Sequence, residues 1–276
     1  MISIIICSRK ADISQELKDN IATTIGCEYE LCVIDNSRND YNIFTAYNEG
    51  VRRAKGDILC FMHEDIFFRS DNWGKEIIKI FHSYNDIGAA GVIGGQFLSS
   101  IHSVWWNASP FVGRIIQGYT DSQGQYHHDC DDGGKVNVLT DAVLVDGCFI
   151  CIPASLFESQ IHWDDSTYSG FHMYDMDICM QILHQNLRVC ITPEILIEHL
   201  SLGVKDESYY KALDVFYDKW EKQLPIYRGI MLNEAELAWR TRLLQENLRY
   251  LQLRLSKPYR LGKLIIKPFN WIKRFI

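Results

Sequence analysis

The feature that most restricts the fold is an alternation of short apolar runs with polar, helix-compatible stretches along residues 1–95. β-Branched runs at residues 2–7 and 30–34 flank a helix-compatible stretch at residues 14–25. Runs that are apolar at every position are typical of strands that are buried on both faces of a sheet. Strands that alternate with helices in this way predict an α/β fold, in which helices cover a mostly parallel central sheet.

The alternation continues through the first third of the chain. Residues 44–55 predict a helix that ends at Gly56, and residues 57–62 predict a third short strand. A helix at residues 72–84 and a strand at residues 87–93 follow. These elements give the first half of the domain a regular βα pattern.

The pattern changes after residue 94. Residues 94–140 are rich in glycine, serine, aspartate, histidine and aromatic residues, and they predict a variable loop. Regular elements return as a strand at residues 143–152, a helix start near Pro153, a helix at residues 173–185 and a strand at residues 188–192.

The sequence predicts one α/β domain over residues 1–202, in halves 1–95 and 96–202, with a helical extension over residues 203–276. The net charge of −7 is uneven, because the last twenty residues carry six cations and no acid. An acidic body argues against nucleic-acid binding, which needs a basic face. The basic, amphipathic tail 257–276 predicts docking on an anionic membrane surface; an oligomer contact or packing on the core is the alternative. The oligomeric state is left open.

The nine cysteines are scattered and do not form a disulfide framework, which favours a reducing compartment. Cys148 and Cys151 form a C-x-x-C pattern inside a strand-like run, where buried thiols are expected rather than a zinc or redox site. Neither a signal peptide nor a membrane-spanning run is visible. We expect a cytoplasmic protein that the tail can hold on the inner face of the cell membrane.

Polar side chains follow each of the first three predicted strands. Parallel α/β sheets bind ligands at the carboxyl ends of their strands, where loops and helix N-termini meet. An acid there can bind a ribose hydroxyl, and a second acid can hold a divalent cation against a diphosphate. Asp, Asn and Ser are also ordinary turn residues, so one cluster alone is open to that explanation. The clusters are Cys7-Ser8-Arg9, Asp35-Asn36-Ser37 and His63-Glu64-Asp65.

The order and spacing of these clusters resemble family 2 glycosyltransferases, which have the GT-A fold. The resemblance covers about residues 2–202 and implies a Rossmann-like, nucleotide-binding α/β domain. The matching segments are Ile4-Ile5-Ile6-Cys7-Ser8-Arg9, Val33-Ile34-Asp35-Asn36-Ser37, Ala46-Tyr47-Asn48-Glu49-Gly50, Ala54-Lys55-Gly56-Asp57 and Phe61-Met62-His63-Glu64-Asp65.

The resemblance implies that these segments bind the nucleotide of a nucleotide sugar. Asp65 keeps the metal-binding position of the family's Asp-x-Asp motif, whereas His63 stands where its first aspartate would be. Histidine can hydrogen-bond a ribose hydroxyl with a different reach, or it can have a purely structural role. The implied nucleotide-binding residues are Cys7, Ser8, Arg9, Asp35, Asn36, Asn48, His63, Glu64 and Asp65.

The second half resembles the acceptor side of the same family. Residues 171–179 are similar to the family's Glu-Asp-x-Asp helix start, with Tyr174 in place of the glutamate and Asp175 at the position of the catalytic base. Asp177 is two residues further on, so it points to another side of the helix; a charge at the helix N-terminus is the alternative role for Asp175. The implied acceptor-binding residues are Asp146, Gly147, Trp105 and Tyr174.

Histidines supply two further candidates. His199 matches a histidine that in relatives approaches the metal or the diphosphate, so the resemblance implies Asp65 and His199 as metal ligands. The polar cluster at residues 127–132 could bind metal, but its irregular spacing favours a solvated acceptor loop.

Together these features predict an enzyme, an inverting glycosyltransferase that uses Mg²⁺ or Mn²⁺. Its donor would be a nucleoside-diphosphate sugar, with UDP favoured. Its acceptor would be a hydroxyl of a glycan or lipid-linked molecule in bacterial polysaccharide, lipopolysaccharide or glycoconjugate synthesis. The alternative is a noncatalytic nucleotide-sugar or glycan-binding protein with a degenerate GT-A site, because His63 and Tyr174 replace family acids. A nucleotidyltransferase is disfavoured, since no glycine-rich loop follows the first strand.

Overall fold

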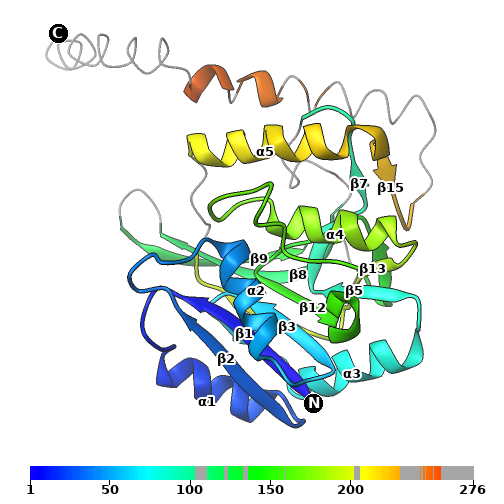
Figure 1. Cartoon of the computed structure of the whole chain (residues 1–276). Coiled ribbons are helices and arrows are strands. Elements are labelled where there is room, and N and C mark those ends of the chain that lie inside the picture. Colours follow the sequence, from blue (N-terminus) through cyan, green and yellow to red (C-terminus); the bar gives the residue numbers. More distant parts are fainter. Residues whose placement is uncertain are drawn as a thin grey trace, which may run out of the picture.

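The computed structural model describes residues 1–102, 111–120, 124–132, 136–158, 160–201 and 206–230, with residues 243, 245, 247–250 and 252–255. A central sheet lies between two layers of helices, and a further helix, α5, lies beyond one of these layers (Figure 1). The predicted α/β architecture is therefore confirmed.

The parallel part of the central sheet comes from the N-terminal half. β1 (Ile2–Ser8) pairs in parallel with β2 (Tyr29–Asp35) on one side and with β3 (Ile58–Met62) on the other. β1 and β3 are buried along almost their whole length, as expected for largely apolar strands. Their carboxyl ends meet at one edge of the sheet, so the polar residues that follow them lie near one another.

The rest of the central sheet mixes directions. The full strand order is β10-β13-β5-β12-β3-β1-β2. β12 (Phe149–Pro153) runs antiparallel between β3 and β5 (Ile87–Gly91). β13 (Arg188–Ile191) pairs in parallel with β5, and β10 (Thr140–Ala142) pairs antiparallel with β13 at the edge. β12 thereby joins the nucleotide half predicted from the sequence to the acceptor half.

A second sheet contradicts the predicted variable loop at residues 94–140. It contains a long hairpin formed by β8 (Phe111–Thr120) and β9 (Tyr126–Asp132). β14 (Ile197–His199) joins β8 to β4 (Ile66–Phe68), which follows the His63-Glu64-Asp65 triplet. The remaining short strands are β6 (Ile93–Gly95) and β11 (Leu144–Val145) in this sheet, and β7 (Phe97–Leu98) paired with β15 (Ile226–Tyr227).

Two boundaries differ from the sequence-based expectations. The strand predicted at residues 143–152 is two strands, β11 and β12, because a turn at Asp146 and Gly147 separates them. The helix expected near Pro153 is a short 3₁₀ segment, η2 (Ala154–Glu158).

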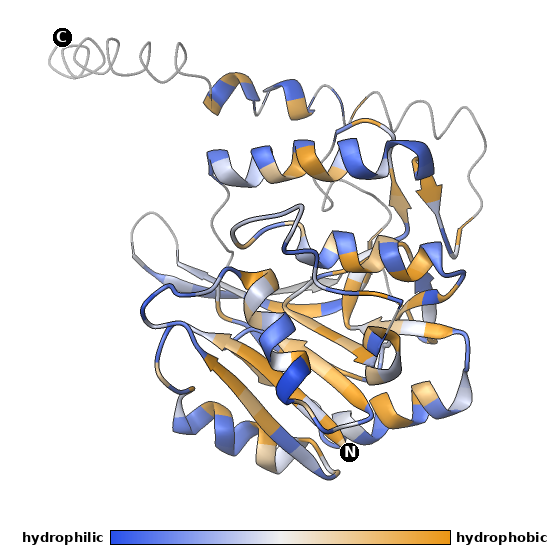
Figure 2. Ribbon diagram, in the orientation of Figure 1, coloured by the Kyte–Doolittle hydropathy of each residue, from blue (hydrophilic) through white to orange (hydrophobic). Residues whose placement is uncertain are grey.

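The helices lie on both faces of the central sheet. α2 (Ile43–Arg53) and α4 (Tyr174–His184) share one hydrophobic cluster with Ile5 of β1. α1 (Gln15–Thr24) and α3 (Trp73–Ser83) share the other with Ile4 and Ile6. Successive residues of β1 thus point to opposite faces. Figure 2 shows apolar residues concentrated in the strands, with polar residues on the outer sides of the helices.

α5 (Glu207–Trp220), followed by the 3₁₀ turn η3 (Glu221–Gln223), packs on the α2 and α4 side. Its inner face contributes Tyr209, Leu213 and Phe216 to the same hydrophobic cluster as α4. The domain boundary predicted at residue 202 stays a prediction, because packing alone does not show where a folding unit ends. Within the described part of the chain, the helices fall short of the length and apolar character needed to cross a membrane.

Candidate metal and nucleotide site

Glu64 ties the third strand end to the first. The Ser8 hydroxyl donates to one carboxylate oxygen of Glu64 at 2.5 Å, and the Arg9 backbone N–H donates to the other at 3.2 Å. Arg9 Nε also donates to Glu64 at 3.2 Å from a largely exposed side chain. The predicted clusters after β1 and β3 are therefore in direct contact, and Glu64 holds the β1 loop in place.

The residues after β2 divide into one that organises the loop and one that faces solvent. Asn36 is buried, and its amide exchanges two hydrogen bonds of 2.9 Å with the backbone of Tyr41. Asp35 is exposed and accepts the Ser37 backbone N–H at 2.9 Å. Burial raises the pKa of the Cys7 thiol to about 11, so this side chain is neutral at physiological pH. Asp35 therefore presents an exposed carboxylate at this end of the sheet.

Asn48 of α2 is engaged with the second half of the chain. Its amide donates to the Trp163 carbonyl at 2.7 Å and accepts the Trp163 backbone N–H at 3.3 Å. These contacts fasten the 160–170 loop to α2. The nucleotide-binding role expected of Asn48, like those of the other implied residues, stays a prediction.

His63, Asp65 and His199 form a group of possible metal ligands whose ligating atoms all lie within 4.8 Å of one another. His199 Nε2 lies 3.4 Å from Asp65 Oδ1 and 3.3 Å from His63 Nδ1. The pairing of β14 with β4 places His199 there, since it is the register partner of Ile66, next to Asp65. Two imidazoles and one carboxylate suit a divalent transition metal such as Mn²⁺.

The ionisation states of Asp65 and His63 also suit the binding of a cation. Burial opposes ionisation of Asp65, but His199 and the Ser201 hydroxyl, which donates at 2.6 Å, hold its pKa well below its usual range. Burial and the neighbouring His199 lower the pKa of His63, which favours the neutral imidazole that metals bind. The sequence predicted His63 among the nucleotide-binding residues and left a structural role open; its two-residue spacing from Asp65 is the signal for a ligand role.

Asp175 lies in the first turn of α4, close to the turn between β11 and β12. Its carboxylate accepts the Gly147 backbone N–H at 3.1 Å and the Met176 backbone N–H at 2.9 Å. Burial and the neighbouring Asp146 raise the pKa of Asp175 to about 7. Asp146 itself accepts the Cys148 backbone N–H at 2.8 Å and so closes the turn.

Tyr174 joins this acidic turn to the metal-ligand group. Its hydroxyl lies 2.7 Å from His63 Nε2, and its ring packs over Gly147. The structure therefore brings Asp146, Gly147 and Tyr174, which were predicted at the acceptor side, next to His63. The acceptor role of these residues stays a prediction.

Asp177 faces away from this site. It is 1% exposed, and its carboxylate accepts hydrogen bonds from Tyr168, Trp220 and Lys219. These partners come from the 160–170 loop and from α5. Asp175 and Asp177 thus have different surroundings, as their spacing predicts, and Asp177 anchors α5 to α4.

The other histidine-rich candidate does not form a loop. Residues 127–132 lie in β9, where His128 Nδ1 is 2.6 Å from Glu198 and His127 stacks on Tyr119. The expected solvated loop at this position is therefore wrong, because its backbone pairs with β8. Trp105 and the basic tail 257–276 lie outside the described residues.

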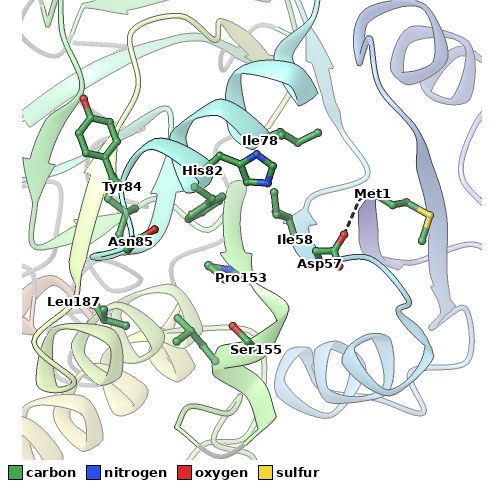
Figure 3. Close-up of a pocket in the computed structure, with 13 residues that line it drawn as sticks. Met1, Asp57, Ile58, Ile78, His82, Tyr84, Asn85, Pro153, Ser155 and Leu187 are labelled. Atoms are coloured by element: carbon green, nitrogen blue, oxygen red, sulfur yellow. Dashed lines mark hydrogen bonds and ion pairs between the residues drawn. The ribbon is translucent and has the colours of Figure 1, made fainter.

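A hollow of about 380 Å³ lies at the opposite edge of the central sheet. Met1, Asp57 and Pro153 line it at the amino ends of β1 and β3 and the carboxyl end of the antiparallel β12 (Figure 3). Its lining includes none of the residues predicted to act in the site. The candidate site is therefore the edge where β1, β2 and β3 end, and not this hollow.

A family model described as glycosyltransferase-like matches residues 3–220. The chain belongs to this glycosyltransferase-like family. The expected enzyme class, a transferase, is thereby confirmed. The match extends through the end of α5, so the glycosyltransferase includes the helix that Asp177 anchors.

Comparison with solved structures shows the GT-A fold for this glycosyltransferase. GalNAc-T7 with UDP, GalNAc and Mn²⁺ is similar with a TM-score of 0.52 and 10% identity, over 80% of this chain and 49% of that chain. The chain thus spans about half the length of that protein. A mannosyltransferase from Pyrobaculum calidifontis, in complex with GDP-Man and Mn²⁺, has a TM-score of 0.48 and 11% identity, over 95% and 83% of the two chains. Comparison with curated proteins finds no match.

Proposed function

We propose that this glycosyltransferase moves a sugar from a nucleoside-diphosphate donor to an acceptor hydroxyl, with inversion at the anomeric carbon. The observation that carries the proposal is the contact between Tyr174 and His63 at one edge of the sheet. Tyr174 is the neighbour in sequence of Asp175, whose pKa is raised, and His63 belongs to the possible metal site. A general base and a cation site side by side are what the reaction needs.

Asp175 is the general base in this proposal. It would accept the proton of the acceptor hydroxyl as that oxygen forms its bond to the anomeric carbon and the bond to the diphosphate oxygen breaks. A base is most effective when its pKa lies near the working pH, and about 7 meets that condition. The hydrogen bond from Gly147 keeps the carboxylate in place while it accepts the proton.

His63, Asp65 and His199 would hold Mn²⁺ or Mg²⁺. A cation there would neutralise the negative charge that grows on the departing nucleoside diphosphate. Asp35, at the end of β2, would bind a ribose or base group of the donor. UDP is the proposed nucleotide, in keeping with the UDP and Mn²⁺ in the similar GalNAc-T7 structure.

Calorimetric titration of UDP, GDP and dTDP, with and without Mn²⁺, tests the donor site. We expect one nucleotide to bind in a Mn²⁺-dependent manner, and Asp65→Ala to abolish that dependence. Asp57→Ala is the matched control, because Asp57 is an exposed acid at the opposite edge of the sheet. Absence of binding to all three would overturn the donor assignment. Donor binding without transfer or donor hydrolysis would favour the noncatalytic alternative.

We further propose that the acceptor is a glycan or lipid-linked precursor of bacterial surface polysaccharide, reached at the inner face of the cell membrane. The sequence of the tail supports this, since residues 257–276 combine six cations with apolar side chains. Flotation with vesicles that contain anionic lipid should recover the full chain, and deletion of residues 257–276 should lower that recovery. Equal recovery of the two chains would exclude docking through the tail.

A further inference from the structure

The two ring nitrogens of His63 face different partners. Nδ1 points to the metal-ligand group, 3.3 Å from His199 Nε2 and 4.0 Å from Asp65 Oδ1. Nε2 lies 2.7 Å from the hydroxyl oxygen of Tyr174. The ring is therefore held between the candidate cation position on one side and a single hydroxyl on the other.

A neutral imidazole carries one N–H group and one lone pair, so the contact at one nitrogen decides what the other can do. Nδ1 can bind a cation only when the proton is on Nε2. In that tautomer Nε2–H needs an acceptor, and the Tyr174 oxygen is at hydrogen-bond distance from it. Metal-binding histidines generally have such a partner on the far nitrogen, and its loss weakens metal binding.

We propose that Tyr174 is a positioning residue of the metal site: its hydroxyl oxygen accepts the Nε2–H of His63 and so directs Nδ1 toward a divalent cation shared with Asp65 and His199. The inference rests on the proposed function, since it assumes a cation at this group. The sequence departs from the family pattern at positions 63 and 174, and the inference explains both departures by one contact.

Tyr174 is fixed well enough to hold the ring. It is 6% exposed and packs edge-on against Tyr47 and Phe44, with ring centroids 5.7 and 6.5 Å away. A Cβ at position 147 would overlap its hydroxyl and its ring, so Gly147 provides the space that the side chain occupies.

The inference is tested by titrating Tyr174→Phe with Mn²⁺ and measuring the free ion by electron paramagnetic resonance. Phenylalanine keeps the ring and removes only the oxygen. We expect a Mn²⁺ affinity about 10- to 100-fold weaker than that of the wild type, the usual effect of losing a partner of a ligating histidine.

A double-mutant cycle separates positioning from general loosening of the site. A His63→Ala background has no ring for Tyr174 to orient, so in it Tyr174→Phe should leave the remaining Mn²⁺ affinity unchanged. An equal loss of affinity in both backgrounds would indicate a merely structural role and overturn the inference. A wild-type chain that binds no Mn²⁺, even with nucleotide, would instead overturn the metal part of the proposed function.

Wild-type protein provides a second measurement that does not depend on the folding of a variant. Long-range ¹H–¹⁵N spectra of histidine-labelled protein report which ring nitrogen carries the proton. With saturating Zn²⁺, which is diamagnetic and binds imidazole nitrogen, we expect His63 to carry it on Nε2. A proton on Nδ1 under these conditions would exclude Nδ1 as a ligand and overturn the inference.

Discussion

The Asp175 carboxylate accepts the backbone N–H of Gly147 at 3.1 Å, which fastens the first turn of α4 to the turn between β11 and β12. This bond joins α4 to the turn that leads into β12, the strand beside β3. The Gly147 donor is a backbone group. The position of the proposed base therefore depends on the course of the main chain.

Asp175→Asn should remove the proton acceptor and preserve the shape of the side chain. We expect turnover to fall by about 10²- to 10⁴-fold, the usual contribution of a general base, with little change in nucleotide affinity in the presence of Mn²⁺. Steady-state kinetics and calorimetry measure the two quantities. Asp165→Asn is the matched control, because Asp165 is exposed and should tolerate the same exchange. Near-normal turnover in Asp175→Asn would rule Asp175 out as the base.

The rate should also depend on the ionisation of Asp175. The proposed base is active only as a carboxylate, and burial together with Asp146 raises its pKa to about 7. kcat/KM should therefore rise as pH increases through about 7 and then level off. The residual activity of Asp175→Asn should lack this rise. A wild-type profile that is flat across this range would contradict the assignment.

The same shift makes a prediction about stability. The folded-state pKa of Asp175 lies above the value of 3.8 for an unperturbed aspartate, so the folded state holds this proton more tightly than the unfolded state. The stabilisation of the folded state by this proton is fully present below pH 3.8 and is lost as pH rises to about 7. Asp175→Asn, which cannot ionise, should therefore unfold at higher denaturant concentration than wild type at about pH 8 and at a similar concentration near pH 4. An equal difference at both pH values would show that the ionisation of Asp175 is not its source.

Lys219 should stabilise the fold because its ion pairs hold α5 in place. Its ammonium lies 2.7 Å from Asp164 and 2.8 Å from the buried Asp177. Lys219→Met leaves these acids without their cation, and the loss of one partner of a buried pair costs about 3 kcal/mol of unfolding free energy. Lys211→Met on the same helix is the control, because the Lys211–Glu207 pair is exposed and should contribute less than about 1 kcal/mol. Similar unfolding free energies for the two variants would argue against the anchor.

The parallel strands could be predicted from the sequence because burial on both faces leaves a simple signal. β1 and β3 are apolar runs that end at polar triplets, and the polar residues lie at the predicted edge. β8 lacks such a signal: Gly113 has a φ of +104°, and burial along the strand does not alternate. The structure alone shows that this segment is a strand, because its partners β6, β9 and β14 are distant in sequence or polar.

Part of the candidate site could be predicted from the resemblance to family 2 glycosyltransferases, which implied Asp65 and His199 as metal ligands and Asp175 as the base. The structure brings Asp65 and His199 to within 3.4 Å of each other. The residues in the contact between Tyr174 and His63 are 111 positions apart. The contact depends on the direction of β12 and on how α4 packs against the sheet. Neither is encoded in a short pattern, so the pairing of these two residues could not be foreseen from sequence.

β12 runs antiparallel to β3, with Phe149 opposite Met62, and the His63 backbone N–H donates to the Cys148 carbonyl at 3.0 Å. The spacing between the proposed cation ligands and the proposed base is consequently maintained in part by main-chain hydrogen bonds. Substitutions in the surrounding core should shorten the lifetime of the folded enzyme before they move its reacting groups apart. Such a scaffold can change its donor and its acceptor over evolutionary time by altering its loops, while the distance between the proposed cation site and the proposed base stays constant.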